Sequence, residues 1–286
     1  MIEVKFYETY YFCNIINNVL NDQFSFLTKL HEFYGDEDIF YLVKPFDKNS
    51  AFHKFIEFIV DDIYFEKTTT IDLDRLKQSN SIKFPLSLQL KCAKLPIELA
   101  FDFHKIEYES FFAFLEDSGK IFESADMEDV YTYMVNTRFV NEYDELLART
   151  TKEIFHVLFQ NRNLMLLFND MLSRALHLNK DSDIPLEYSE FFSRQGVLAR
   201  KAIPKWVKQA VYFRDKGRCV LCDKDLSGTV NLKNIENYDH IIPLAQHGFN
   251  DVTNIQLLCK ECNQIEKKDK YVVTSNKYQS WYSYDE

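Results

Sequence analysis

The sequence contains little glycine and proline, with six of each among 286 residues. Long tracts rich in these residues form flexible linkers, disordered segments or collagen-like fibres, so their scarcity argues against those classes. Hydrophobic residues make up 46% and charged residues 27%, which is the balance of a compact soluble protein that can bury a large core. Because the chain is longer than one typical domain, we expect two domains.

Long hydrophobic runs are also missing. No stretch of about 18 apolar residues occurs, so we expect no transmembrane helix and no membrane partner. The first twelve residues, MIEVKFYETYYF, include Glu3 and Glu8, and they lack the basic start and apolar stretch of a secretion signal. We therefore expect a cytoplasmic protein in a reducing compartment.

Positive charge is scarce in the chain as a whole, which carries 34 Lys and Arg against 44 Asp and Glu, a net charge of −10. Such a chain is not expected to coat nucleic acid through its overall charge. The charge is uneven, however. From Arg200 onward there are 14 basic and 11 acidic residues (+3), which leaves 20 and 33 (−13) in the first 199. We expect the acidic part to contact a protein partner or to self-associate, and the C-terminal part to approach DNA.

The first 195 residues show mixed patterns. Apolar and polar residues alternate over Phe84–Leu90 and Ile97–Phe103, which predicts short strands, whereas Ala51–Val60 has a helical pattern. From Met127 to Leu178 apolar residues recur at spacings of three and four without any glycine or proline, which predicts helices. We predict an α+β fold in which residues 1–195 form a mainly helical domain with some strands.

Residues 196–286 are predicted to form the second domain. Pro204 suits the first turn of a helix that continues to about Arg214. Val207 and Val211 would lie on one face of this helix, and Lys208 and Arg214 elsewhere.

Cysteines occur as two close pairs in this second domain. Cys219 and Cys222 form one CxxC pair, Cys259 and Cys262 form the other, and 36 residues separate the two. Two residues between thiolates allow both sulfurs of a tight turn to reach one ion, and two such turns complete a closed tetrahedral zinc shell. The spacing therefore predicts a structural Zn²⁺ site. The remaining cysteines, Cys13 and Cys92, are predicted to be buried thiols.

Polar residues with catalytic potential lie between the two pairs and overlap the second. They are Asp239, His240, Asn254 and Asn263, in the segment YDHIIPLAQHGFNDVTNIQLLCKECNQIEKK. Here the sequence resembles the HNH endonuclease family, over about residues 201–270 only. The resemblance implies a ββα-metal module: a hairpin with the Asp-His pair, a connecting loop with the middle Asn, and a helix with the last ligand.

The resemblance also implies roles for these residues. His240 is similar to the general base that takes a proton from the attacking water. Asp239 and Asn263 are similar to the ligands of one catalytic divalent ion, Mg²⁺ or Mn²⁺. Asn254 is similar to the middle Asn, which orients the loop that bears the histidine. Because Asn263 stands where the family name has a histidine, the chain is an HNN variant, which favours a hard cation.

Basic residues near the motif are candidate nucleic-acid contacts. Lys267 would lie one turn beyond Asn263, and Arg214 and Arg218 flank the first cysteine pair. Lys268 and Lys270 are expected to be solvated. His247, which stands where many relatives have a glycine, is either a substrate contact or an ordinary loop residue.

These features predict a metal-dependent endonuclease that hydrolyses DNA phosphodiester bonds and cuts one strand per active site. The pairing with an unrelated acidic domain is similar to that in bacterial anti-phage defence and restriction proteins, with homing nucleases of mobile elements as an alternative. A non-catalytic zinc module that binds DNA or a protein is another alternative. Arg149 and His156 resemble the Arg and His of helical HEPN ribonucleases, but the match is short, and helix-surface charge or a satisfied core histidine explains them better.

Overall fold

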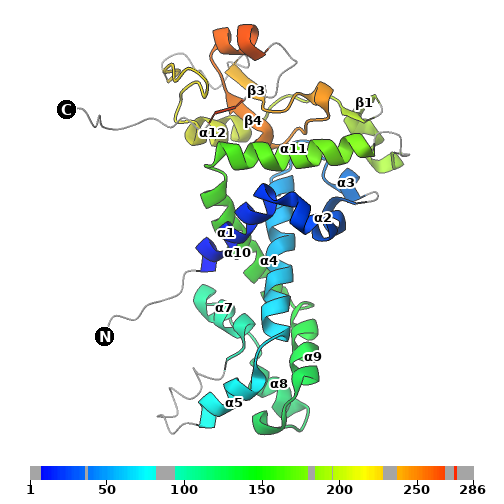
Figure 1. Ribbon diagram of the computed structural model, residues 1–286, viewed down its shortest axis with the longest axis vertical. Coiled ribbons are helices and arrows are strands. Elements are labelled where there is room, and N and C mark those ends of the chain that lie inside the picture. Colours follow the sequence, from blue (N-terminus) through cyan, green and yellow to red (C-terminus); the bar gives the residue numbers. More distant parts are fainter. Residues whose placement is uncertain are drawn as a thin grey trace, which may run out of the picture. The chain divides into compact units, whose positions relative to one another are not determined.

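The structure is a computed structural model that describes residues 8–35, 38–81, 94–179, 184–194, 196–227, 237–267 and 274–275, without the side chains of residues 79–81 and 265–267. The described chain is mostly helical, and its strands form two short antiparallel pairs near the C-terminus (Figure 1). The predicted mainly helical fold with some strands is thereby confirmed.

The helices and 3₁₀ turns before the first strand are α1 (Glu8–Asn21), η1 (Gln23–Phe26), α2 (Leu27–Tyr34), α3 (Asp38–Tyr41), α4 (Ala51–Thr69), α5 (Leu73–Ser81), α7 (Pro96–His104), α8 (Phe111–Asp117), η2 (Phe122–Ser124), α9 (Met127–Thr137), α10 (Asn141–Leu158), α11 (Arg162–Leu178) and η3 (Leu186–Phe191). The elements that follow are β1 (Phe192–Arg194), β2 (Val197–Leu198), α12 (Lys205–Arg214), β3 (Tyr238–His240), η5 (Leu244–Gln246), η6 (Val252–Asn254), β4 (Ile255–Leu257) and the π-helical turn η7 (Cys262–Lys267).

The chain divides into two compact units. The first unit consists of residues 1–55 and 154–286, and the second consists of residues 56–153. Helices α4 and α10 contribute residues to both units. The predicted domain boundary near residue 195 lies within the first unit. The assignment of residues 196–286 to a separate C-terminal module stays a prediction.

The first unit has an aromatic core between helices far apart in the sequence. Phe52 and Phe55 of α4 pack against Phe168 of α11, with ring centroids 4.8 and 5.4 Å from that of Phe168. All three rings are fully buried. Helix α11 also contacts η6, and α12 contacts β4, so the helical core continues directly into the strand pair that carries the sequence motif (Figure 1).

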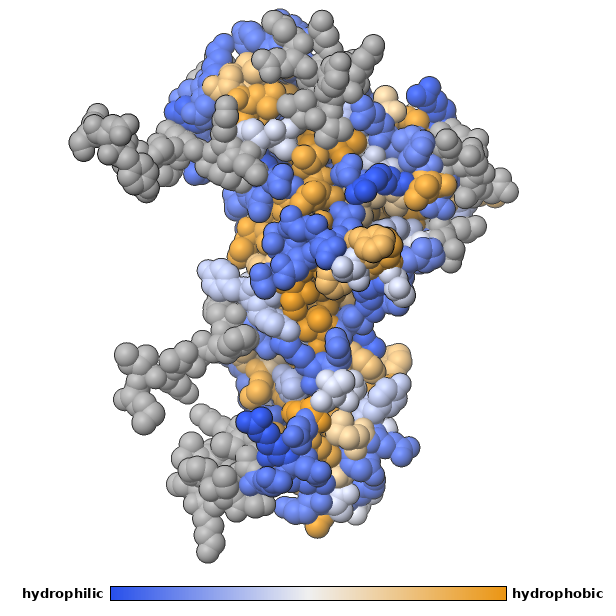
Figure 2. Space-filling model, in the orientation of Figure 1, coloured by the Kyte–Doolittle hydropathy of each residue, from blue (hydrophilic) through white to orange (hydrophobic). Residues whose placement is uncertain are grey.

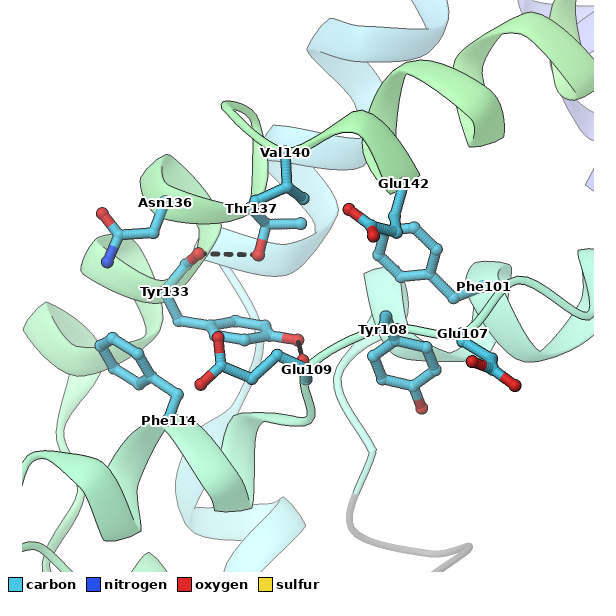
Figure 3. A pocket seen from close by; sticks show the side chains of 10 residues that line it. All are labelled: Phe101, Glu107, Tyr108, Glu109, Phe114, Tyr133, Asn136, Thr137, Val140 and Glu142. Atoms are coloured by element: carbon cyan, nitrogen blue, oxygen red, sulfur yellow. Dashed lines mark hydrogen bonds between the residues drawn. The ribbon is translucent and has the colours of Figure 1, made fainter.

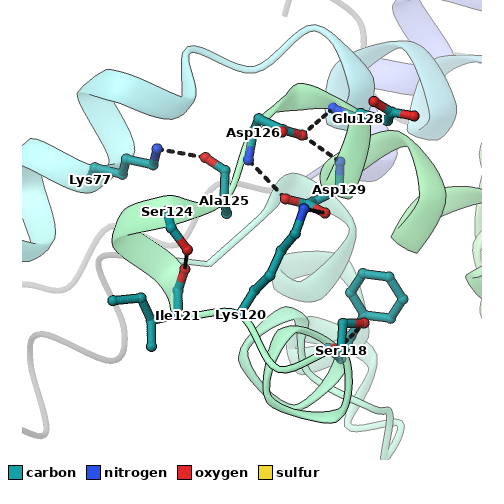
Figure 4. A network of polar contacts seen from close by, with 10 residues as sticks. Lys77, Ser118, Lys120, Ile121, Ser124, Ala125, Asp126, Glu128 and Asp129 are labelled. Atoms are coloured by element: carbon teal, nitrogen blue, oxygen red, sulfur yellow. Dashed lines mark hydrogen bonds and ion pairs between the residues drawn. The ribbon is translucent and has the colours of Figure 1, made fainter.

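The second unit shows how local polar contacts set helix ends. Asp126 caps α9 by accepting hydrogen bonds from the amides of Glu128 and Asp129, and the Asp129 carboxylate accepts one from the Asp126 amide (Figure 4). Lys120 pairs with Asp129 at 2.6 Å, and Lys77 donates to the Ala125 carbonyl at 2.6 Å. These contacts fix the start of α9 at Met127, where the apolar periodicity of the sequence also begins.

The sequence predictions for secondary structure differ in their outcomes. The predicted helices over Ala51–Val60 and Met127–Leu178 are confirmed by α4, α9, α10 and α11. The predicted strand over Ile97–Phe103 is wrong, because these residues form α7. Pro96 begins that helix, and Glu98 accepts a hydrogen bond from the Leu95 amide at 2.7 Å, so local capping outweighs the alternating pattern. The predicted strand Phe84–Leu90 lies outside the described residues.

The sequence predicts that the two remaining cysteines are buried thiols. Cys13 is buried in α1, and burial raises the pKa of its thiol to about 11, whereas Cys92 lies outside the described residues.

Among the described helices, none combines the length and apolar character needed to cross a bilayer. On the face drawn in Figure 2, hydrophilic and hydrophobic side chains are interspersed.

Candidate active site and zinc centre

The four cysteines of the two CxxC pairs lie together. Their sulfur atoms are all within 4.8 Å of one another, and the Cys222 and Cys259 sulfurs are 3.7 Å apart. Cys219, Cys259 and Cys262 are buried, whereas Cys222 is exposed. The sequence prediction that these side chains meet is therefore confirmed.

Backbone hydrogen bonds hold the two cysteine pairs in place. The Val220 amide donates to the Leu257 carbonyl at 3.0 Å, which joins the first pair to the end of β4. The amide of Cys262 points at the Cys259 sulfur, at 3.4 Å, which is the geometry of a metal-binding turn. The cluster thus ties the segment before β3 to the segment after β4.

The cluster fits zinc. Sulfurs about 2.3 Å from a tetrahedral ion lie about 3.8 Å from one another, close to the 3.7 Å between Cys222 and Cys259. Burial, in the absence of a cation, raises the pKa of Cys259 to about 11. Such thiols become thiolates when a cation compensates their charge, so the donor set suits a structural zinc ion.

Strand β3 carries the first two motif residues, Asp239 and His240, and β4 is its partner. They pair antiparallel, with Asp239 opposite Gln256 and His240 opposite Ile255. His240 is 3% exposed, and Asp239, which precedes it in β3, is partly exposed. Neighbouring side chains of a strand point to opposite faces. The side chains of Asp239 and His240 are therefore directed to opposite faces of the β3–β4 pair.

A hydrogen-bond chain defines the protonation pattern of His240. Asn250 donates from Nδ2 to the Ala199 carbonyl at 2.9 Å, so its Oδ1 faces Nε2 of His240 at 3.3 Å. An amide oxygen can only accept, so Nε2 of His240 carries the hydrogen and the basic lone pair lies on Nδ1. Nothing in the sequence singles out Asn250 from an ordinary loop residue, and the sequence analysis missed it.

If His240 is the general base that the sequence predicts, changing Asn250 is expected to alter its proton transfer. Asn250→Ala removes the acceptor for Nε2 and should lower the cleavage rate by about 10- to 100-fold. Asn250→Asp places a carboxylate beside the imidazole, which favours the imidazolium and raises the pKa of His240. The acidic limb of the pH–rate profile should therefore move to higher pH in Asn250→Asp. A profile that does not move would show that Asn250 only supports the fold.

Asn254 makes three side-chain hydrogen bonds to the loop that follows His240. It accepts from the Ile242 amide at 2.9 Å, and it donates to the carbonyls of Ile242 and Phe249 at 3.0 and 2.9 Å. The side chain is fully buried. Both ends of the loop are therefore tied to one amide, an arrangement that suits the orienting role expected for Asn254.

Gly248 is required where this loop closes. A Cβ atom at residue 248 would lie 2.0 Å from the Ile242 carbonyl oxygen, the same atom that Asn254 binds. Gly248→Ala must therefore displace the loop, and we expect a cost of about 3 kcal/mol in the free energy of unfolding. Gly119→Ala, which has open space but a φ of +71°, should cost only about 1 kcal/mol. Chemical denaturation of both variants tests this, and equal losses would contradict it.

The two predicted ligands of the catalytic ion come from different elements. Asp239 lies on β3 and Asn263 on η7, and both are partly exposed. A carboxylate and an amide offer hard oxygen donors, which suit Mg²⁺ or Mn²⁺ rather than softer metals. Their roles, like those of His240 and Asn254, remain predictions.

The basic residues predicted to contact DNA have different positions. Arg214 is 1% exposed, and it binds Asp215 at 2.8 and 2.9 Å and the Ile255 carbonyl at 2.6 Å. Arg214 thus joins α12 to β4 from a buried position, which leaves it little surface for the predicted DNA contact. Arg218 is partly exposed and binds the Asp223 carbonyl at 2.9 Å. Lys267 ends η7, and its side chain lies outside the described part, as do Lys268 and Lys270.

The helices of the first unit hold the loop that precedes Asn254. The buried carboxylate of Asp251 accepts from the Ala51 amide, at the start of α4, at 2.9 Å. Burial raises the pKa of this carboxyl. Asn169 of α11 donates to Thr253 at 3.0 Å. Only long-range packing brings these groups together, so the local sequence pattern could not reveal the contacts.

His247, Arg149 and His156 are the remaining candidates from the sequence. Nε2 of His247 is 2.8 Å from Nδ1 of His177, and Nδ1 of His247 contacts the Gly196 carbonyl. Both ring nitrogens of His247 therefore have partners. Arg149 binds Glu145 and the His104 carbonyl, and His156 is exposed. None of these contacts supports the ribonuclease alternative.

Comparison with known families identifies the segment that contains the site. Residues 219–269 match the family model of the HNH endonucleases, which confirms the resemblance over a segment of 51 residues in a chain of 286. The segment includes the four cysteines, both strands and all four polar motif residues. No curated protein and no solved structure matches the chain.

Proposed function

We propose that the chain is a metal-dependent endonuclease that hydrolyses DNA phosphodiester bonds with His240 as general base. The observation that carries this proposal is the bond between Nε2 of His240 and Asn250, which directs the basic lone pair to Nδ1. A module that served only as a zinc scaffold has no need to fix a histidine tautomer. The match to the HNH endonuclease model supports the same chemistry.

Each remaining motif residue would have a distinct task. Asn254 would hold the loop after β3 in place through its three hydrogen bonds. Asp239 and Asn263 would hold one Mg²⁺ or Mn²⁺, which when bound supplies positive charge to the scissile phosphate and the leaving oxygen. Lys267 and Arg218 would contact the DNA backbone. His240 would take the proton of the attacking water.

We also propose that the helical part of the chain controls this site. The supporting contacts run from α4 and α11 to the loop between β3 and β4: Ala51 to Asp251, and Asn169 to Thr253. Any movement of these helices would be transmitted to Asn250 and Asn254, which hold His240 and its loop. Such control fits a restriction or anti-phage defence nuclease, in which cleavage must await a signal.

The test is a plasmid assay with the full chain. Protein with one zinc per chain is incubated with supercoiled DNA in dialysed buffer, with Mg²⁺, with Mn²⁺, and with chelator, and zinc is measured again afterwards. We expect nicked circles before linear DNA, only with added metal, because one site cuts one strand. Zinc-loaded, folded protein that cuts under none of these conditions would mean either that the nuclease is held off until a signal arrives or that the zinc module is only a scaffold. Linear DNA without a nicked intermediate would contradict single-strand cleavage.

A further inference from the structure

A cavity lies within the second unit, far along the sequence from the HNH segment. Its volume is about 340 Å³, and its walls come from α7, α8, α9, the start of α10 and the segment that joins α7 to α8 (Figure 3). Every lining residue belongs to residues 56–153. This volume is at the lower end of the range for small-molecule sites in proteins, so the cavity can hold a small ligand.

Two aromatic pairs form much of the wall. Phe114 and Tyr133 lie on one side with ring centroids 5.5 Å apart, and Phe101 and Tyr108 lie stacked on the other at 5.0 Å (Figure 3). The Tyr133 hydroxyl donates to the Glu109 carbonyl at 2.6 Å, which fixes its ring. The walls therefore contain ordered aromatic rings, and the faces of such rings carry a negative electrostatic potential that attracts cations.

Carboxylates complete the lining. Glu107, Glu109 and Glu142 are all exposed side chains at the cavity, and Lys, Arg and His are absent from its lining. Within the described part of the chain, none of these three carboxylates forms an ion pair. Lys94 does not line the cavity, but it binds Asp102 and the Tyr108 hydroxyl, and its ammonium lies 5.4 Å from the centroid of the Tyr108 ring. The cavity thus combines aromatic rings with three carboxylates that have no ion-pair partner among the described residues.

We propose that this cavity binds a small organic ammonium ion. An ammonium group between the two aromatic pairs would lie near aromatic rings on both sides and near carboxylates at the rim, and both attract it. A neutral ligand of the same shape would gain only the apolar contact. A ligand that bears phosphate, such as a nucleotide, would be repelled by the three glutamates. The site is independent of the proposed nuclease chemistry.

Titration calorimetry and thermal unfolding of the full chain test the proposal, with choline and spermidine as probes. We expect at least one of the two to bind and to raise the unfolding temperature, because a ligand that binds only the folded state stabilises it. The uncharged choline isostere dimethylbutanol should bind more weakly than choline, and the nucleotide AMP should not bind. Absence of binding by both ammonium probes at millimolar concentration, or binding of AMP in their place, would overturn the proposal.

Variants locate the binding. Glu142→Gln and Phe114→Leu should each weaken ammonium binding by about tenfold, since each removes one attractive contact while keeping similar volume. Glu116→Gln is the matched control: this exposed glutamate of α8 does not line the cavity, and its replacement should leave affinity unchanged. Circular dichroism confirms that each variant is folded. Equal affinity in wild type, Glu142→Gln and Phe114→Leu would place the ligand elsewhere and overturn the assignment.

Discussion

His240→Ala is expected to lower the rate of plasmid nicking by about 10²- to 10⁴-fold, the usual contribution of a positioned general base. His240 is the residue whose protonation pattern the structure specifies, through the Asn250 amide and the Ala199 carbonyl. Loss of the imidazole removes the proton acceptor but none of the four cysteines. Zinc content should therefore stay at one per chain while turnover is lost.

A second variant separates chemistry from packing. Because His240 is 3% exposed, truncation to alanine leaves a cavity and can lower stability as well as activity. His240→Gln keeps a side-chain donor for Asn250 but cannot take a proton at neutral pH. We expect His240→Gln to unfold at nearly the wild-type temperature and to be as inactive as His240→Ala. Substantial nicking by His240→Gln would show that His240 positions the loop and that another group is the base.

The control for a lost histidine is His156→Ala. His156 is exposed on α10, so its replacement should change neither stability nor DNA cleavage. The same protein decides the ribonuclease alternative. If RNA cleavage is present in wild type and disappears in His156→Ala while DNA cleavage is unchanged, the helical part has an activity of its own.

The sequence predicts the elements whose cause is local. Pro204 predicts the start of α12, which the structure places at Lys205–Arg214, and uninterrupted apolar periodicity predicts α9 to α11. The spacing of the cysteines predicts their convergence, because a CxxC turn has little freedom. At Ile97–Phe103 the prediction fails although the cause is also local, because the capping by Pro96 and Glu98 carries more weight than alternation.

Long-range contacts account for what the sequence analysis missed at the site. The sequence pattern predicts that Arg214 lies on the surface of a basic helix. In the structure it is buried against Asp215 and β4, and its Cζ lies 5.0 Å from the centroid of the Phe159 ring. Asn250 acquires its importance only when β3 and the backbone near Ala199 meet. A pattern within one segment contains no information about a partner 41 or more residues away.

The zinc site is expected to govern the stability of the C-terminal module. In small zinc domains the apparent free energy of metal binding is about 10–16 kcal/mol, comparable to or larger than the stability of a whole domain. Here the cluster joins the segment before β3 to the end of β4, so its loss releases both strands from the first cysteine pair. We expect Cys259→Ser to lose the metal, to expose residues 219–267 to proteolysis, and to abolish nicking.

Zinc stoichiometry, thermal unfolding and limited proteolysis of wild type, Cys259→Ser and Cys13→Ala together test this dependence. Cys13 is buried in α1 outside the cluster, so Cys13→Ala controls for loss of a buried thiol and should keep one zinc per chain. Protease cuts should be confined to the C-terminal module, because the aromatic core of α4 and α11 has its own contacts. If Cys259→Ser instead retains zinc and the wild-type unfolding curve, three thiolates suffice, and the metal is not what holds His240 on its strand.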